Sequence, residues 1–165
     1  MEDYSHILTH FGEDRDKVLG AVNPPIYYTS NFAFNTVAEM RHALTHEMDV
    51  PFYTRGHNPT VAVLRKKLAA LEKAEECLLF GSGSAAMAAA VMSQVQQGDH
   101  VVCVQKPYSW TGKLLVKLLS RYGVSHTFID GTEASNYESA IQENTKLLIL
   151  ESPNSMTFEL QDLPA

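Results

Sequence analysis

Short apolar segments alternate with helix-like segments from about residue 58 onward, and this alternation constrains the fold more than any other feature. Residues 100–104 and 147–150 are almost wholly apolar, so each is predicted to be a strand that is buried on both faces. Crossover helices between parallel strands cover both faces of such a sheet. The sequence therefore predicts an α/β fold, with a mostly parallel sheet and helices on both faces.

The N-terminal part of the chain lacks this alternation, and Pro24 and Pro25 favour extended backbone there. We therefore predict an arm with one short helix over residues 1–57 and an α/β segment over residues 58–165. The expected helices span about residues 36–46, 58–75, 85–92, 109–122 and 134–144, and the expected strands span residues 77–80, 100–104, 125–129 and 147–150. The expected inward-facing residues are Val61, Leu64, Leu68 and Leu71 in the second helix and Leu114, Leu115, Leu118 and Leu119 in the fourth.

Composition argues against two classes of partner. The 165 residues include 13 Lys and Arg against 19 Asp and Glu, and the net charge of −6 leaves no broad basic face for nucleic acid. No segment approaches the ~18 apolar residues of a membrane-spanning helix, and the acidic N-terminus is unlike a signal peptide. Cys77 and Cys103 lie in apolar runs, so we expect reduced core residues of a cytoplasmic protein.

His42 and His46 lie four residues apart on a predicted helix, a spacing that can bind zinc. The run between them lacks the internal Glu of the metalloprotease motif, and no third ligand is evident in the sequence. We therefore expect exposed helix histidines and predict no metal site.

The turn Gly81-Ser82-Gly83-Ser84 is the first motif with chemical meaning. Glycines let the backbone approach a ligand, and the free N–H groups at the start of the following helix favour an anion such as phosphate. The spacing matches neither a dinucleotide-binding Gly-x-Gly-x-x-Gly nor a P-loop. By itself the turn fits a phosphate cradle and a plain connection from strand to helix about equally well.

Three segments in order make the turn more specific: Pro24 to Phe32, Tyr53 to Thr60, and Phe80 to Ala86. Together they resemble the pyridoxal-phosphate enzymes of cysteine and methionine metabolism, a family that includes cystathionine γ-synthase, cystathionine γ-lyase and methionine γ-lyase. The resemblance extends from the arm to Leu163 and implies the large domain of fold-type I, with pyridoxal 5'-phosphate as the cofactor. Residues 58–165 would then be the first part of the cofactor-binding domain.

The resemblance implies two groups of residues that hold the cofactor phosphate. Tyr53 and Arg55 match the family's Tyr-x-Arg, which reaches into the neighbouring subunit. A guanidinium offers a forked pair of donors to phosphate oxygens, and a phenol adds one more. Gly83 and Ser84 match the positions whose backbone N–H groups cradle the same phosphate.

The resemblance also implies contacts to the pyridine ring. Tyr108 matches the family tyrosine that stacks on the ring and is a candidate for proton transfer. Ser109 and Trp110 replace two glycines that are common in the family, and an indole there would narrow the substrate pocket. Ser155 stands where the family has an asparagine that binds the cofactor hydroxyl. Asn154 precedes it and is the alternative for that contact.

No lysine of the chain lies in the family motif for the Schiff-base lysine. The chain is therefore expected to be the N-terminal portion of an enzyme that acts at Cβ or Cγ of sulfur-containing or O-activated amino acids, and to be inactive alone. The resemblance implies a homodimer or tetramer. Two alternatives stay open, namely a non-catalytic module that binds phosphate or cofactor, and an unrelated nucleotide-binding α/β domain.

Overall fold

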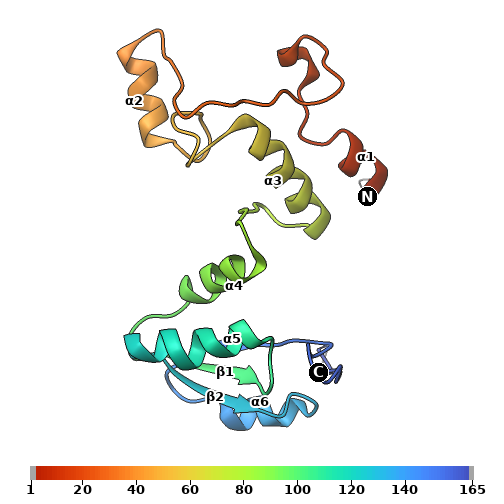
Figure 1. Ribbon diagram of the computed structural model, residues 1–165, viewed down its shortest axis with the longest axis vertical. Coiled ribbons are helices and arrows are strands. Elements are labelled where there is room, and N and C mark those ends of the chain that lie inside the picture. Colours follow the sequence, from red (N-terminus) through yellow and green to blue (C-terminus); the bar gives the residue numbers. More distant parts are fainter. Residues whose placement is uncertain (1–2, 164–165) are drawn as a thin grey trace. The chain divides into compact units, whose positions relative to one another are not determined.

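The computed structural model describes residues 3–163. The chain divides between Leu79 and Phe80 into two compact units, the N-terminal unit (residues 1–79) and the C-terminal unit (residues 80–165). Figure 1 shows helices and connecting segments in the N-terminal unit and the strands of the sheet in the C-terminal unit. No helix among residues 3–163 is long and apolar enough to cross a membrane.

The helices of the N-terminal unit begin at polar capping residues. The short helix α1 (Tyr4–Thr9) begins after Asp3, whose side chain accepts a hydrogen bond from the Ser5 N–H. A 3-10 turn follows at Arg15–Val18. The predicted helix at residues 36–46 is confirmed as α2 (Val37–Thr45), where Thr36 and Glu39 form a reciprocal capping box.

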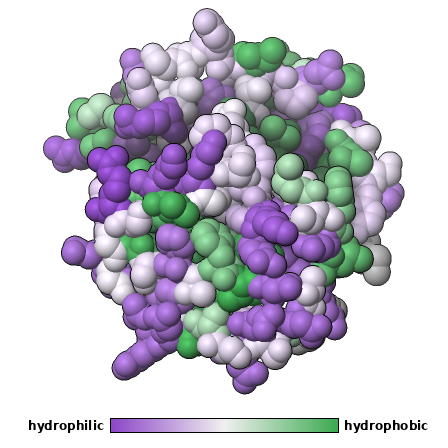
Figure 2. Space-filling model, turned by 60° about the horizontal axis from the view of Figure 1, so that its bottom comes forward, coloured by the Kyte–Doolittle hydropathy of each residue, from purple (hydrophilic) through white to green (hydrophobic). Residues whose placement is uncertain are grey.

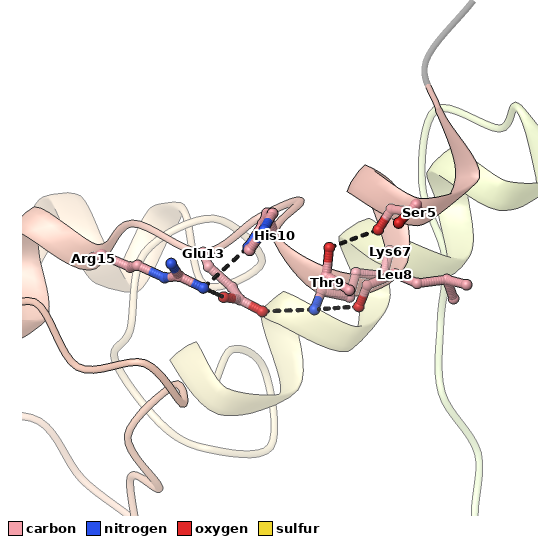
Figure 3. Close-up of polar contacts among 7 residues, drawn as sticks. All are labelled: Ser5, Leu8, Thr9, His10, Glu13, Arg15 and Lys67. Carbon is pink, nitrogen blue, oxygen red and sulfur yellow. Dashed lines mark hydrogen bonds and ion pairs between the residues drawn. The ribbon is translucent and has the colours of Figure 1, made fainter.

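Lys67 joins the first loop of the chain to α3 (Pro59–Glu72). Its ammonium group donates to the Leu8 carbonyl at 2.9 Å and to Glu13 Oε1 at 2.6 Å (Figure 3). Arg15 approaches the other Glu13 oxygen at 3.4 Å. The Glu13 side chain is only 8% exposed, so this ion pair is shielded from solvent and ties the N-terminal loop to the helix.

The predicted apolar stripe on α3 is only partly correct. Leu68 and Leu71 are half-buried, but Val61 and Leu64 are 44% and 49% exposed, and Ala69 is the buried residue of the helix. Only the C-terminal part of the stripe is covered within the described residues, so the predicted burial of Val61 and Leu64 is wrong for this chain.

The C-terminal unit is a three-stranded parallel sheet with helices on both sides. The strands β1 (His100–Val104), β2 (Ser125–Ile129) and β3 (Thr145–Ile149) lie in the order β2-β1-β3, so β1 is central. The chain moves from β1 to β2 in one direction and then from β2 past β1 to β3 in the other, so right-handed crossovers put their helices on opposite faces. Figure 1 shows α5 (Ser109–Lys113) on one side of the strands and α6 (Ala134–Ala140) on the other. The predicted α/β class with a parallel sheet is confirmed.

The core of this unit forms around β1, all of whose residues are buried. The helix α4 (Gly83–Met92) contributes Val91, and the segment that continues α5 contributes Leu114, Leu115 and Leu119. That continuation is a π-helical turn at Leu114–Leu118 followed by a 3-10 turn at Leu119–Tyr122. Leu118 was expected to face inward but is exposed, because the change of helical pitch rotates it away from the core.

A predicted strand at residues 77–80 is absent. These residues are in no strand, and Leu78, Leu79 and Phe80 are exposed. A strand exists through hydrogen bonds to a neighbour, and no segment within residues 3–163 pairs with this one. The sheet within the described residues therefore has three strands where four were predicted.

Candidate functional site

Tyr53 and Arg55 lie together at the surface of the N-terminal unit. The Arg55 guanidinium carbon is 5.2 Å from the centre of the Tyr53 ring, a cation–π contact. Both residues line an open depression of about 770 Å³, together with Tyr27 to Ser30 and Thr54. Arg55 is exposed and forms no hydrogen bond or ion pair with any residue between 3 and 163. Its charge is therefore available to an anion.

Asn58 and Thr60 hold the arm beside this pair. The buried Asn58 amide group donates to the Tyr27 carbonyl at 3.0 Å and to Thr54 Oγ1 at 3.1 Å. Its Oδ1 accepts from the Thr60 N–H at 2.9 Å and so caps α3. The Thr60 hydroxyl donates to the Pro25 carbonyl and accepts from the Tyr27 N–H, each at 2.9 Å. Asn58 and Thr60, which follow Arg55 in the sequence, thus hold the Tyr53–Arg55 loop beside the arm.

Gly83 and Ser84 open helix α4 in the C-terminal unit. Ser82 is the capping residue, and its hydroxyl accepts from the Ala85 N–H at 3.1 Å. The N–H groups of Gly83 and Ser84 have no partner within the described part of the chain. A Cβ added at Gly81 or Gly83 would meet nothing within 4 Å. The start of α4 therefore presents open backbone donors, as the phosphate-cradle prediction requires.

Ser84 and Tyr108 line one cavity of about 350 Å³ in the C-terminal unit. The cavity lies between α4, which contributes Met87 and Ala88, and the segment that begins with α5, which contributes Trp110 and Thr111. Lys113 extends over the Trp110 ring with its ammonium nitrogen 4.2 Å from the ring centre. The Thr111 hydroxyl oxygen is buried and has no hydrogen-bond partner among residues 3–163.

Tyr108 and Ser155 follow neighbouring strands, and Glu151 joins them. The Tyr108 N–H donates to Glu151 Oε2 at 2.8 Å and to Oε1 at 3.1 Å, and the Ser155 N–H donates to Oε1 at 2.7 Å. Burial raises the pKa of Glu151, but hydrogen bonds from Ser155 and from the Tyr108 N–H outweigh burial, so the pKa lies below its usual range. The carboxylate is therefore ionised at neutral pH.

Asn154 is already engaged within the protein. It is 1% exposed, its amide group donates to the Gln105 carbonyl at 3.2 Å, and its Oδ1 accepts from the Met156 N–H at 3.2 Å. Ser155 is exposed at the same end of the sheet. Of the two alternatives for the cofactor hydroxyl, Ser155 has the exposed side chain and Asn154 the buried one.

The structure brings three pairs of predicted site residues together. Tyr53 lies with Arg55, Ser84 shares a cavity with Tyr108, and Tyr108 and Ser155 share one carboxylate partner. Gly83 adjoins Ser84 in the first turn of α4. The predictions did not include Glu151. Glu151 did carry two sequence signals: it opens the segment Glu151 to Met156, which resembles the family's Glu-Thr-Pro-x-Asn-Pro, and it directly follows an apolar strand, where parallel sheets commonly place ligand-facing residues.

The two helix histidines are stacked on each other. The His42 and His46 ring centres are 4.2 Å apart. Within residues 3–163, no group of three or more His, Cys, Asp or Glu side chains is arranged to hold a metal ion.

Comparison with known proteins gives a consistent set of relatives. An L-methionine gamma-lyase of Treponema denticola is 38% identical over 156 residues, which cover 94% of this chain and 39% of that protein. A cystathionine beta-lyase of Escherichia coli is 33% identical, covering 96% of this chain and 40% of that protein. A probable cystathionine gamma-synthase of Herpetosiphon aurantiacus is 36% identical, covering 94% and 46%.

The fold matches solved structures over the same extent. The crystal structure of metB from Corynebacterium glutamicum aligns with a TM-score of 0.88 at 31% identity, covering 98% of this chain and 40% of that chain. A putative O-acetylhomoserine (thiol)-lyase of Campylobacter jejuni with a bound pyridoxyl-lysine phosphate gives the same TM-score at 24% identity, and it supports the fold alone. The chain spans about two fifths of the length of the first two curated relatives.

The family described as Cys/Met metabolism PLP-dependent enzyme matches residues 5–165, nearly the whole chain. The resemblance first carried by the arm, the Tyr-x-Arg segment and the glycine turn is thereby confirmed. This chain belongs to the pyridoxal-phosphate-dependent enzymes of cysteine and methionine metabolism.

Proposed function

We propose that this chain forms the phosphate side of the cofactor site in an enzyme that eliminates or replaces groups at Cβ or Cγ of sulfur-containing or O-activated amino acids. The observation that supports this most is the cavity shared by Ser84 and Tyr108 beside the open start of α4. Family membership excludes the alternative of an unrelated nucleotide-binding domain.

The residues present fit pyridoxal 5'-phosphate. The unpartnered N–H groups of Gly83 and Ser84 suit a phosphate, and Tyr108 offers an aromatic face on the same cavity. Ser155 would donate or accept a hydrogen bond at the cofactor hydroxyl. When bound, the cofactor supplies an electron sink for carbanion chemistry. This chain's residues would bind and orient it, and the Tyr108 hydroxyl is the candidate for moving a proton.

Tyr53 and Arg55 are proposed to serve the phosphate of a neighbouring subunit, which makes the working protein at least a homodimer. An exposed, unpaired guanidinium supports this role, because a charge-assisted, forked contact to phosphate needs donors that no protein group already uses. The proposed location is the cytoplasm, which the two unpaired cysteines Cys77 and Cys103 support.

A titration of the 165-residue chain with pyridoxine 5'-phosphate tests this proposal. This analogue has no aldehyde and so cannot react with surface lysines. Trp110 is the single tryptophan and lines the cavity, so its fluorescence reports binding. We expect a saturable change that inorganic phosphate competes away, and about tenfold weaker binding in Arg55→Ala.

Arg41→Ala is the matched control, because Arg41 is an exposed arginine of α2 in the same unit. It should bind as the unaltered chain does. The proposal fails if the unaltered chain shows no saturable change, or if Arg55→Ala and Arg41→Ala bind equally well. We also expect the chain alone to release no product from methionine, cystathionine or O-acetylhomoserine.

A further inference from the structure

The Glu151 carboxylate receives backbone donors from two loops that are far apart in sequence. Tyr108 follows β1 and Glu151 follows β3, 43 residues later. Tyr108 donates to both carboxylate oxygens, at 2.8 and 3.1 Å, and Ser155 donates at 2.7 Å. No lysine, arginine or histidine within residues 3–163 forms an ion pair with Glu151. The charge is therefore satisfied by these N–H groups.

The two ends of the Tyr108 peptide are held differently: its carbonyl accepts from the Thr111 and Gly112 N–H groups at 2.9 and 3.2 Å, whereas its N–H donates only to Glu151 among residues 3–163. Tyr108 is the residue before α5, and its own side chain does not cap that helix. Tyr108 as a whole is 46% exposed, so packing alone does not hold it. A hydrogen bond to an ionised acceptor is stronger than one between neutral groups. Within residues 3–163, Glu151 is thus the side chain that ties the Tyr108 N–H to the loop after β3.

We propose that Glu151 is a positioning residue that holds Tyr108 and Ser155, the ring-stacking residue and the candidate hydroxyl contact, at fixed places on neighbouring strand ends. The inference rests on the proposed cofactor site, since positioning matters only if those residues meet a ligand. A carboxylate is suited to this task because it has two acceptor oxygens and can serve two loops at once.

A neutral amide at position 151 would hold the Tyr108 N–H less well than the carboxylate does. In Glu151→Gln, one oxygen is replaced by an NH₂ group, which is a donor and would face the Tyr108 N–H. The remaining oxygen can still accept from Ser155. We therefore expect the substitution to release Tyr108 more than Ser155.

Amide hydrogen exchange, followed residue by residue by NMR in the chain without ligand, tests the positioning itself. In Glu151→Gln we expect exchange to accelerate about tenfold at Tyr108, less at Ser155, and not at Val102 in the centre of β1. Glu138→Gln, an exposed acid on α6 with no hydrogen bond from its side chain, is the control and should leave all three amides unchanged. Equal acceleration at Val102 would show a merely structural role and overturn the proposal, as would unchanged exchange at Tyr108.

A second measurement needs no variant and covers the case in which Glu151→Gln fails to fold. In the unaltered chain, the amide proton shifts of Tyr108 and Ser155 should titrate together, with one midpoint below about 4.3, the ordinary pKa of Glu. The nearby Cys103 stays protonated throughout, because burial and the Glu151 charge raise its pKa to about 12. Separate midpoints for the two amides would contradict a shared carboxylate.

Binding of pyridoxine 5'-phosphate, measured together with amide exchange, distinguishes failure of this inference from failure of the proposed function. If both hold, Glu151→Gln binds the analogue several-fold more weakly by Trp110 fluorescence, and Glu138→Gln does not. If exchange at Tyr108 responds but no variant binds the analogue, the positioning stands and the cofactor proposal fails. If the unaltered chain binds and Glu151→Gln binds equally well with unchanged exchange, the positioning fails alone.

Discussion

At the scale of single residues, one buried histidine links all three strands of the sheet. His100 lies on the central strand and is 1% exposed. Its Nδ1 lies 2.8 Å from Thr145 Oγ1 on β3, and its Nε2 lies 2.9 Å from Thr127 Oγ1 on β2. In the neutral ring one nitrogen donates and the other accepts, so both threonine hydroxyls are satisfied. From the sequence, His100 is predicted only as the first residue of a strand.

We predict that protonation of His100 destabilises the C-terminal unit. Burial, with the charge of His126, lowers the pKa of His100, so the folded state prefers the neutral ring. Stability is then complete above the unfolded value of about 6.5 and falls as pH decreases below it toward the folded value. Urea midpoints should therefore drop between pH 7.5 and 5.5.

His100→Gln is the control for this pH dependence. The glutamine amide cannot gain a proton between pH 7.5 and 5.5, so the urea midpoint should fall less than in the unaltered chain. The variant itself should cost about 1 to 3 kcal/mol at pH 7.5, because one threonine hydroxyl loses its partner. If the urea midpoint of His100→Gln falls with pH as steeply as that of the unaltered chain, the pH dependence comes from other histidines.

At the scale of elements, local sequence signals placed α2 and α3 well, but α1 was not predicted and one strand was misjudged. Thr36 and Glu39, and Asn58 with Pro59, are capping signals that act within a few residues, and both helices begin where predicted. The segment at residues 77–80 has strand-like composition, but composition supplies no pairing partner. Strands at residues 100–104 and 125–129 form because they pair with each other.

We predict that Asn58 stabilises the N-terminal unit by joining segments, beyond its role as a helix cap. Asn58→Ala should cost about 2 kcal/mol, since it removes the cap and leaves the Tyr27 carbonyl without its donor. Asn58→Asp keeps the cap oxygen and loses both bonds from the amide group. Urea unfolding should show Asn58→Asp nearly as destabilised as Asn58→Ala.

Thr36→Ala provides the comparison, because it removes a cap that joins no distant segment. It should cost about 1 kcal/mol. If Asn58→Asp is as stable as the unaltered chain, capping alone accounts for Asn58, and the arm must be held beside the Tyr53–Arg55 loop by other contacts.

At the scale of the whole molecule, the chain exposes more apolar surface than its own elements can cover. On α3 this includes Val61 and Leu64, and on α2 it includes Val37, Met40 and Leu44. In Figure 2 several patches of apolar side chains lie among polar ones on the face that is turned forward. Contiguous exposed apolar surface in a folded chain marks an interaction site.

We predict concentration-dependent self-association, measured by sedimentation velocity. Leu64→Lys should shift the distribution toward monomer, because it places a charge on the exposed stripe of α3, and should cost little stability at a half-exposed position. Glu72→Lys adds a lysine at an exposed polar position of the same helix and should not alter association. A chain that stays monomeric at every concentration would contradict the prediction and weaken the proposed sharing of Arg55 between subunits.

The sequence by itself determined the α/β class, the starts of α2 and α3, and the family, because caps, apolar runs and short motifs are local. Only the tertiary structure decided that Asn154 is buried and engaged within the protein while Ser155 is exposed, and it revealed Glu151 as the partner of Tyr108. Those facts depend on which loops meet at the ends of β1 and β3. Strand pairing brings residues 43 positions apart into hydrogen-bond contact, and no local pattern encodes that distance.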